Sequence, residues 1–332
     1  MTPTPSLVHR TVPGPAGRIH LVEQGEGPLV LLVHGFPESW YSWRHQLPAL
    51  AAAGYRAAAI DVRGYGRSSK PADVAAYRMT ELVEDCAAAV HGLGERAAAV
   101  VGHDWGAGIA ANSALLRPDV FTAVAMLSVP YAPRGGPRPS EVFAGMAGEE
   151  EFYVSRFQEP GRVEAEIEPD VRGWLAGFFA ALSADTMPGP EAPDPHFAAR
   201  DGQLRDRFPD GRRLLPGWLS EDDLDFYAAE FERTGISGAL ARYRNMDRDW
   251  EDLADLDGAA IAQPSLFLGG GLDASTTWLA AAIEAYPKTL PGLVGSYILE
   301  GCGHWIQQER AEEVNRRLIE WLEACQSANG KP

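Results

Sequence analysis

The chain has 332 residues, of which 45% are hydrophobic, and carries a formal net charge of −17. This length and apolar content predict a folded globular protein, built as one large domain or as a core with an insertion. The strongly negative charge argues against nucleic acid or an anionic membrane as a partner, because binding to phosphate requires positive charge.

Three cysteines, Cys86, Cys302 and Cys325, are scattered without the spacing of a disulfide framework. An odd number of isolated thiols is typical of a reducing compartment. The first residues show no basic segment followed by an apolar run, and no apolar stretch approaches the length of a membrane span. We therefore expect a cytoplasmic protein without a membrane segment, and the oligomeric state is left open between a monomer and a homodimer.

The first part of the chain alternates segments typical of strands and helices. A hairpin is expected from residues 6–10 and 18–23, joined by a Pro- and Gly-rich connection at 12–17. Continuous apolar runs predict buried strands, and the segments between them predict helices. The predicted strands are 29–33, 56–62, 97–101 and 121–129, and the predicted helices are 45–53 and 80–93. Such alternation favours a mostly parallel sheet whose ligands bind beyond the carboxyl ends of its strands.

The alternation stops after Pro130, where residues 131–139 have the composition of a linker. Residues 140–246 show helical patterns and no convincing strand, and 186–213 are expected to form a long irregular loop. The helices expected in this region are 141–156, 171–184, 221–233 and 236–245. The strand pattern resumes at 264–268 and 295–299, and a last amphipathic helix is expected at 309–325. These patterns predict an α/β core interrupted by a helical cap.

The residues Gly102-His103-Asp104-Trp105-Gly106 lie between a predicted strand and an Ala-rich predicted helix. Small residues two positions to either side of a central residue are typical of a nucleophile elbow, where a tight turn lifts the central side chain above the sheet. Here the central residue is Asp104 instead of the more common serine. An aspartate that merely caps the next helix would fit this stretch equally well.

A histidine that could act as a base follows the last predicted strand. His304 stands in a Gly-x-Gly-His turn directly after 295–299, whereas most of the eight histidines are expected to be ordinary surface or core residues. A nucleophile, a base and an acid that orients the base are the groups that a covalent mechanism requires. We therefore expect His304 to be the base.

The acid that orients the base should follow a strand between Asp104 and His304. After the predicted strand 121–129, no carboxylate appears before Glu141. After 264–268, three glycines lead to Asp273. A turn aspartate is the ordinary interpretation of such a residue, but its place at a strand end makes Asp273 the preferred candidate.

A carboxylate nucleophile favours chemistry that a serine does not perform. An ionised Asp104 can attack a saturated carbon without a base, which gives an alkyl ester. His304, oriented by Asp273, can then activate water against that ester, and backbone N–H groups of Phe36 and Trp105 are expected to stabilise the oxyanion. Epoxides and alkyl halides fit this chemistry, which requires neither a cofactor nor a metal.

The two substrate classes need different hydrogen-bond donors. A departing halide needs N–H donors, typically from Trp, whereas an epoxide oxygen needs an acid such as Tyr. Tyr153 and Tyr243 in the predicted cap are candidates for that acid. A tyrosine on a helix is more often part of a core or an interface, so the residue types alone leave both classes open.

Taken together, the motifs resemble those of the α/β-hydrolase-fold epoxide hydrolases over nearly the whole chain. The matching stretches are HGFPESWYSWRHQ at 34–46, DVRGYGRS at 61–68, GHDWG at 102–106 and GHW at 303–305. HGFP and GHDWG also occur in haloalkane dehalogenases. Tyr153 and Tyr243 discriminate, because FQEPG at 157–161 and YRNM at 243–246 are similar to the contexts that hold the family's ring-opening tyrosines.

The resemblance implies an α/β-hydrolase fold, with a mostly parallel sheet flanked by helices and an inserted helical cap. The core would comprise residues 1–132 and 247–332, and the cap residues 133–246. The order nucleophile, acid, histidine along the chain agrees with this fold. The pocket wall is expected to include Phe36, Pro37, Trp105 and Trp305.

The implied activity is conversion of an epoxide to a vicinal diol. Asp104 would form the covalent ester, Tyr153 and Tyr243 would hydrogen-bond the ring oxygen, and water activated by His304 and Asp273 would release the product. A haloalkane dehalogenase and a non-catalytic ligand-binding member of the fold are the alternatives. The natural epoxide and the preferred enantiomer are not indicated by the sequence.

Overall fold

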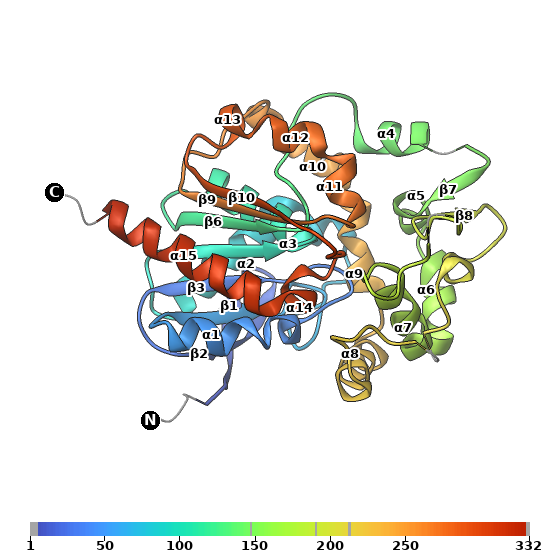
Figure 1. Ribbon diagram of the computed structural model, residues 1–332, viewed down its shortest axis with the longest axis horizontal. Helices are drawn as coiled ribbons and strands as arrows, with labels where there is room; N and C mark the ends of the chain where they lie inside the picture. Colours follow the sequence, from blue (N-terminus) through green and yellow to red (C-terminus); the bar gives the residue numbers. More distant parts are fainter. Residues whose placement is uncertain (1–5, 147, 190, 212–213, 330–332) are drawn as a thin grey trace.

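The centre of the protein is an eight-stranded sheet (Figure 1) in a computed structural model that describes residues 6–329 apart from 147, 190 and 212–213. The strand order is β1-β2-β4-β3-β5-β6-β9-β10. Only the β1–β2 and β2–β4 pairs are antiparallel. The bounds are β1 (Val8–Gly14), β2 (Gly17–Gln24), β3 (Leu29–Val33), β4 (Arg56–Ile60), β5 (Ala98–His103), β6 (Phe121–Leu127), β9 (Ser265–Gly270) and β10 (Leu293–Leu299). The predicted mostly parallel sheet is confirmed.

Helices cover both faces of this sheet, which explains why the central strands are continuous apolar runs. In β3, Leu31 and Val33 pack into a core shared with α2 (Met79–Gly92) and α3 (Trp105–Leu116). Val30 and Leu32 face the opposite core, which is shared with α1 (Gln46–Ala52) and α15 (Ala311–Asn329). Figure 1 shows the resulting three layers.

The strand order places the loops after β3 and β5 side by side. β3 pairs with β4 on one side and with β5 on the other, with Val33 opposite Gly102. The connections that leave β3 and β5 diverge to opposite sides of the sheet, and such a point opens a crevice at the carboxyl ends of parallel strands. The chain therefore brings residues 34–37 next to Asp104.

Much of the chain between β6 and β9 lies at one end of the sheet, where α5 to α8 are gathered in Figure 1, whereas α10 lies beside α11 (Ala274–Trp278) and α12 (Ala280–Glu284) in that view. Its helices are α4 (Pro139–Met146), α5 (Tyr153–Phe157), α6 (Arg162–Ile167), α7 (Val171–Ala181), α8 (Glu221–Thr234), α9 (Ser237–Ala241) and α10 (Met246–Asp252). Short 3-10 helices are η3 (Glu168–Asp170), η4 (Leu204–Arg207), η5 (Tyr243–Asn245) and η6 (Ala254–Leu256). The region is mainly helical, as the sequence predicted.

Two expectations for this region are wrong. A two-stranded antiparallel sheet forms from β7 (Glu150–Phe152) and β8 (Phe197–Ala199), where only helices and an irregular loop were expected. β7 also interrupts the helix expected at 141–156. Phe152 pairs with Phe197 across this sheet, and their ring centroids lie 5.3 Å apart. A pairing between segments so distant in sequence leaves no local periodicity by which it could be predicted.

Other differences concern where elements begin and end. The hairpin strands β1 and β2 extend to Gly14 and Gly17, so most of the expected connection at 12–17 is strand. The last helix is divided at Arg310 into α14 (Ile306–Glu309) and α15. Short helices that the sequence did not indicate are η1 (Trp40–Trp43), η2 (Val74–Tyr77), α11 (Ala274–Trp278), α12 (Ala280–Glu284) and α13 (Tyr286–Thr289). In the described part of the chain, none of the helices is both long and apolar enough to cross a membrane.

Candidate active site

Asp104 stands at the sharp turn between β5 and α3 with φ 54° and ψ −121°, a conformation that costs free energy for a non-glycine residue. Two glycines make the turn possible. A Cβ on Gly102 would lie 1.9 Å from the Gly106 carbonyl oxygen, and one on Gly106 would lie 2.0 Å from the Val33 carbonyl oxygen. The structure thus places the Asp104 side chain above the edge of the sheet.

Asp104 occupies the N-cap position of α3, but among the described residues its side chain makes no capping hydrogen bond to that helix. Its Oδ1 accepts a hydrogen bond of 2.8 Å from the backbone N–H of Phe36. Burial raises the pKa of Asp104, while the charges of His304 and His103 and the N–H group of Phe36 limit that rise. The carboxylate is therefore directed into the crevice and not onto its own helix.

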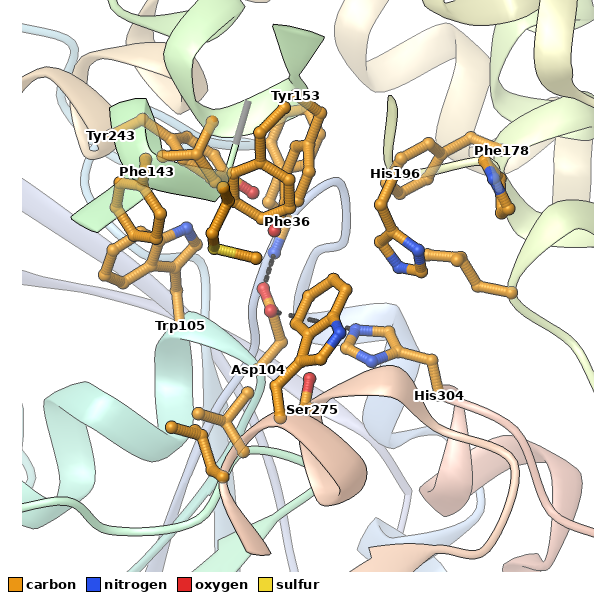
Figure 2. Close-up of a pocket in the computed structure, with 18 of the residues that line it drawn as sticks. Phe36, Asp104, Trp105, Phe143, Tyr153, Phe178, His196, Tyr243, Ser275 and His304 are labelled. Carbon is orange, nitrogen blue, oxygen red and sulfur yellow. Dashed lines mark hydrogen bonds and ion pairs between the residues drawn. The ribbon is translucent and has the colours of Figure 1, made fainter. Parts of the chain in front are cut away.

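The His304 ring lies between the carboxylates of Asp104 and Asp273, and Figure 2 shows its position beside Asp104. His304 Nε2 lies 3.7 Å from Asp104 Oδ2, and His304 Nδ1 lies 3.2 Å from Asp273 Oδ2. Burial alone would lower the pKa of His304, but Asp273 and Asp104 overcome this and raise it to about 9. Burial alone would raise the pKa of Asp273, but His304 and a hydroxyl from Ser128 lower it to about 2.

One of the three glycines before Asp273 is required by close packing. A Cβ on Gly270 would lie 2.1 Å from the backbone oxygen of Gly303. The loop that carries His304 therefore crosses directly over the end of β9. Only a residue without a side chain allows the Asp273 and His304 loops to approach each other this closely.

Tyr153 and Tyr243 reach the same cavity from α5 and η5, and Figure 2 shows both on the far side of the cavity from the Asp104 backbone. Their ring centroids are 6.2 Å apart. Burial raises the pKa of both phenols and the charge of Asp104 adds to the rise in each, so each is a neutral O–H donor at neutral pH. The Trp105 indole packs edge-to-face against the Tyr243 ring, with ring centroids 5.1 Å apart.

Known proteins resemble this chain over almost its whole length. Residues 28–311 match the α/β hydrolase fold family. Epoxide hydrolase B of Mycobacterium tuberculosis is 44% identical over 96% of this chain and 98% of its own. The structure of an epoxide hydrolase from an endophytic Streptomyces is 68% identical, with a TM-score of 0.94 over 97% of this chain and 96% of that chain. The chain belongs to the α/β-hydrolase-fold epoxide hydrolases.

A second solved structure, epoxide hydrolase A from Mycobacterium thermoresistibile, is 43% identical with a TM-score of 0.88, over 96% of this chain and 98% of that chain. In this chain a cavity is lined by residues from the ends of the sheet and from the helices between β6 and β9. The cavity has a volume of about 530 Å³. It is mostly apolar, and its lining includes Phe36, Asp104, Trp105, Phe143, Phe152, Tyr153, Phe178, His196, Tyr243, Ser275, Trp278 and His304.

The expected pocket wall needs one correction. Phe36 and Trp105 line the cavity, whereas Pro37 and Trp305 are buried and are not among the described lining residues. The Trp305 indole instead donates a hydrogen bond of 3.0 Å to the Phe179 carbonyl oxygen and packs between the core and the cap. Position next to His304 in sequence therefore did not predict which way the Trp305 side chain points.

A buried ion pair beneath the site was missed by the sequence reasoning, although both residues lie within quoted motifs. Glu38 Oε2 lies 2.7 Å from His103 Nδ1, and the other ring nitrogen of His103 lies 2.8 Å from the His304 carbonyl oxygen. Both partners are acceptors, so both ring nitrogens donate and His103 carries a positive charge. Burial alone would raise the pKa of Glu38, but His103 lowers it to about 2.

Glu38 also joins the loops that surround this pair. It accepts hydrogen bonds from the Gly35 backbone N–H at 3.0 Å and from the Gln307 amide at 2.8 Å. The loop that carries Phe36, the turn at Asp104 and the loop that carries His304 are therefore joined through one buried carboxylate. Within the described residues, no group of three or more His, Cys, Asp or Glu side chains is arranged to hold a metal ion.

Proposed function

We propose that this chain converts an epoxide to a vicinal diol through a covalent ester on Asp104. The observation that carries the proposal is the placement of Asp104 in one cavity with two neutral tyrosines and with His304. A carboxylate supplies a nucleophile, the tyrosines supply a proton for the ring oxygen, and the histidine supplies a base for water. An epoxide needs all three groups for ring opening and release.

In the first step Asp104 Oδ2 attacks one oxirane carbon. The carbon–oxygen bond of the ring breaks, and the oxygen becomes an alkoxide that takes a proton from Tyr153 or Tyr243. Phe36 N–H remains on Oδ1, so the free oxygen is the one that bonds to carbon. Two phenols that face Asp104 in one cavity favour an epoxide over a halide as the bound group, because an epoxide oxygen needs an acid.

In the second step neutral His304 removes a proton from water, and the hydroxide attacks the Asp104 ester carbon. The ester carbonyl oxygen becomes an oxyanion in reach of the Phe36 and Trp105 N–H groups. Collapse of this intermediate expels the second diol oxygen as an alkoxide, which takes the proton of the new Asp104 carboxylic acid and so restores the carboxylate. His304 then returns its proton, through solvent, to the phenolate that ring opening left on the tyrosine, and the diol is released. One water is consumed, and the groups of the protein end as they began.

The proposal is tested by a single turnover of styrene oxide in ¹⁸O-labelled water with enzyme in excess. Label should enter the Asp104 carboxylate, and the diol from this first turnover should contain none, because its new oxygen comes from Asp104. Mass spectrometry of the peptide that contains Asp104 measures this. Asp104→Asn should abolish turnover. A labelled diol with an unlabelled Asp104 would mean direct attack of water and would exclude the covalent route.

Three broader parts of the proposal concern the whole chain. We propose that residues 133–246 form a cap domain over a core of residues 1–132 and 247–332, because the cavity is lined from both segments. We also propose a cytoplasmic location and a homodimer. Limited proteolysis tests the domain bounds, cell fractionation tests the location, and sedimentation equilibrium tests the assembly.

A further inference from the structure

Ser128 directly follows β6. This is the strand after which the sequence has no carboxylate before Glu141. The φ of Ser128 is +71°, and Asp104 is the only other non-glycine residue of the described chain with a positive φ. The Val129 N–H donates to the Leu127 carbonyl at 2.9 Å, which closes a γ-turn of the rare, strained kind around Ser128. Such strain persists only where the surroundings enforce it, and it gathers at functional sites.

The strained turn directs the Ser128 hydroxyl at the base and its orienting acid. Ser128 Oγ lies 2.5 Å from Asp273 Oδ2 and 2.9 Å from His304 Nδ1. The direct distance from His304 Nδ1 to Asp273 Oδ2 is longer, at 3.2 Å. The nearest partner of the histidine's inner nitrogen is therefore the hydroxyl and not the carboxylate.

The direction of these hydrogen bonds follows from counting protons. An ionised carboxylate only accepts, so the one hydroxyl proton of Ser128 is donated to Asp273. The Ser128 oxygen can then only accept from His304 Nδ1–H. This arrangement requires the proton on Nδ1 when the imidazole is neutral, which leaves Nε2, the nitrogen that faces Asp104 at 3.7 Å, as the basic one.

We propose that Ser128 is a positioning residue for the hydrolytic step, and that it holds His304 in the tautomer and orientation that make Nε2 the base. This inference rests on the proposed function, since it assigns Ser128 to the second step of that mechanism. Ester formation by Asp104 does not require a neutral His304. Loss of the Ser128 hydroxyl should therefore slow release of the ester and leave its formation nearly unchanged.

The test compares Ser128→Gly with Ser128→Ala. Glycine adopts the positive φ without strain, so Ser128→Gly removes the hydroxyl and keeps the turn. Ser265→Ala is the matched control. Ser265 is an equally buried serine, but it lies at the amino end of β9, whereas Asp273 follows the carboxyl end of that strand. Rapid-quench mass spectrometry with styrene oxide measures formation and decay of the Asp104 ester separately.

In both Ser128 variants ester formation should stay within about 2-fold of wild type, while ester hydrolysis should fall by about 10-fold or more, so that the ester accumulates. The midpoint of the pH profile of hydrolysis should also move. Unchanged hydrolysis in Ser128→Gly would overturn the inference. An equal fall in both steps, together with a lower melting temperature, would also overturn it, because that is the signature of a merely structural residue.

An independent measurement separates this inference from the proposed function. If no Asp104 ester forms in wild type, the proposed mechanism is wrong. The hydrogen bond from His304 Nδ1–H to Ser128 Oγ can then still be measured by NMR. A downfield Nδ1–H resonance of His304 should shift or disappear in Ser128→Gly and stay in place in Ser265→Ala. A resonance unchanged in Ser128→Gly would overturn the assignment of Ser128 whatever the activity.

Discussion

The side-chain amide of Gln158 donates a hydrogen bond of 3.0 Å to the backbone carbonyl oxygen of Tyr243. The same amide donates to the carbonyl oxygen of Val154, beside Tyr153. Arg244 reinforces this connection, because its guanidinium donates to the Phe157 carbonyl oxygen at 3.1 Å. Hydrogen bonds from Gln158 and Arg244 thus connect the segment that carries Tyr153 to the segment that carries Tyr243. These hydrogen bonds set the position of both phenols relative to Asp104.

Removal of the Gln158 hydrogen bonds should slow opening of the epoxide ring. In Gln158→Ala we expect formation of the Asp104 ester to slow by about 10-fold, because small displacements of a proton donor reduce its contribution sharply. Ester hydrolysis should not change. Rapid-quench kinetics measure both steps, and Gln326→Ala, at an exposed position on α15, is the control. Unaltered ester formation in Gln158→Ala would show that the tyrosines are held in place by other contacts.

The two phenols should act in the same step. Tyr153→Phe and Tyr243→Phe are each expected to slow ester formation by about 10²-fold, and the double variant by at least about 10³-fold, because a positioned acid contributes on this scale. Rates of ester decay should stay near the wild-type value. If the double variant opens styrene oxide as fast as wild type, the assignment of both tyrosines is wrong.

The hydrolytic step should depend on pH through His304. In the resting protein burial lowers the pKa of His304, but the charges of Asp273 and Asp104 raise it to about 9. Ester formation neutralises Asp104, so the pKa of His304 in the ester intermediate should lie below that value. Because only neutral imidazole accepts a proton from water, hydrolysis should speed up as pH rises through this pKa and then level off.

Single-turnover hydrolysis rates would measure this dependence between about pH 5 and about pH 10. This range of pH brackets the ordinary pKa of a histidine. Ester formation is the internal control, since it requires ionised Asp104 and should decline only towards acid pH. Burial raises the pKa of Asp104, so that decline should begin above the ordinary range of an aspartate. A hydrolysis rate that does not vary with pH would argue against His304 as the base.

The Glu38–His103 pair should be important for stability. Glu38→Gln removes the charge that compensates buried His103, and we expect it to lower the free energy of unfolding by about 3 kcal/mol. Denaturant titrations measure this quantity. The control is Glu84→Gln, because Glu84 has a side chain that is 51% exposed and pairs with Arg117. That exposed pair should contribute less than about 1 kcal/mol. Equal effects of the two substitutions would contradict a special role for Glu38.

The sequence determined the elements whose signal is local. Buried parallel strands are runs of apolar residues, and sharp turns require glycine, so the sheet and the turn at Asp104 could be predicted from neighbouring residues alone. The strand ends also predicted which edge of the sheet would carry Asp104, Asp273 and His304, because parallel strands bring their carboxyl ends to one side. The structure brings these three residues together.

Tertiary structure alone decided the contacts between residues that are distant in sequence. Ser128 touches His304, Glu38 pairs with His103, and β7 pairs with β8. The partners in each of these contacts are far apart in the sequence, so no local periodicity could predict that they meet. Trp305 shows the same limit, because packing against Phe179 and not its neighbour His304 fixes its direction. Close packing and hydrogen bonding between distant segments set these orientations, and such contacts exist only once those segments have come together in the folded chain.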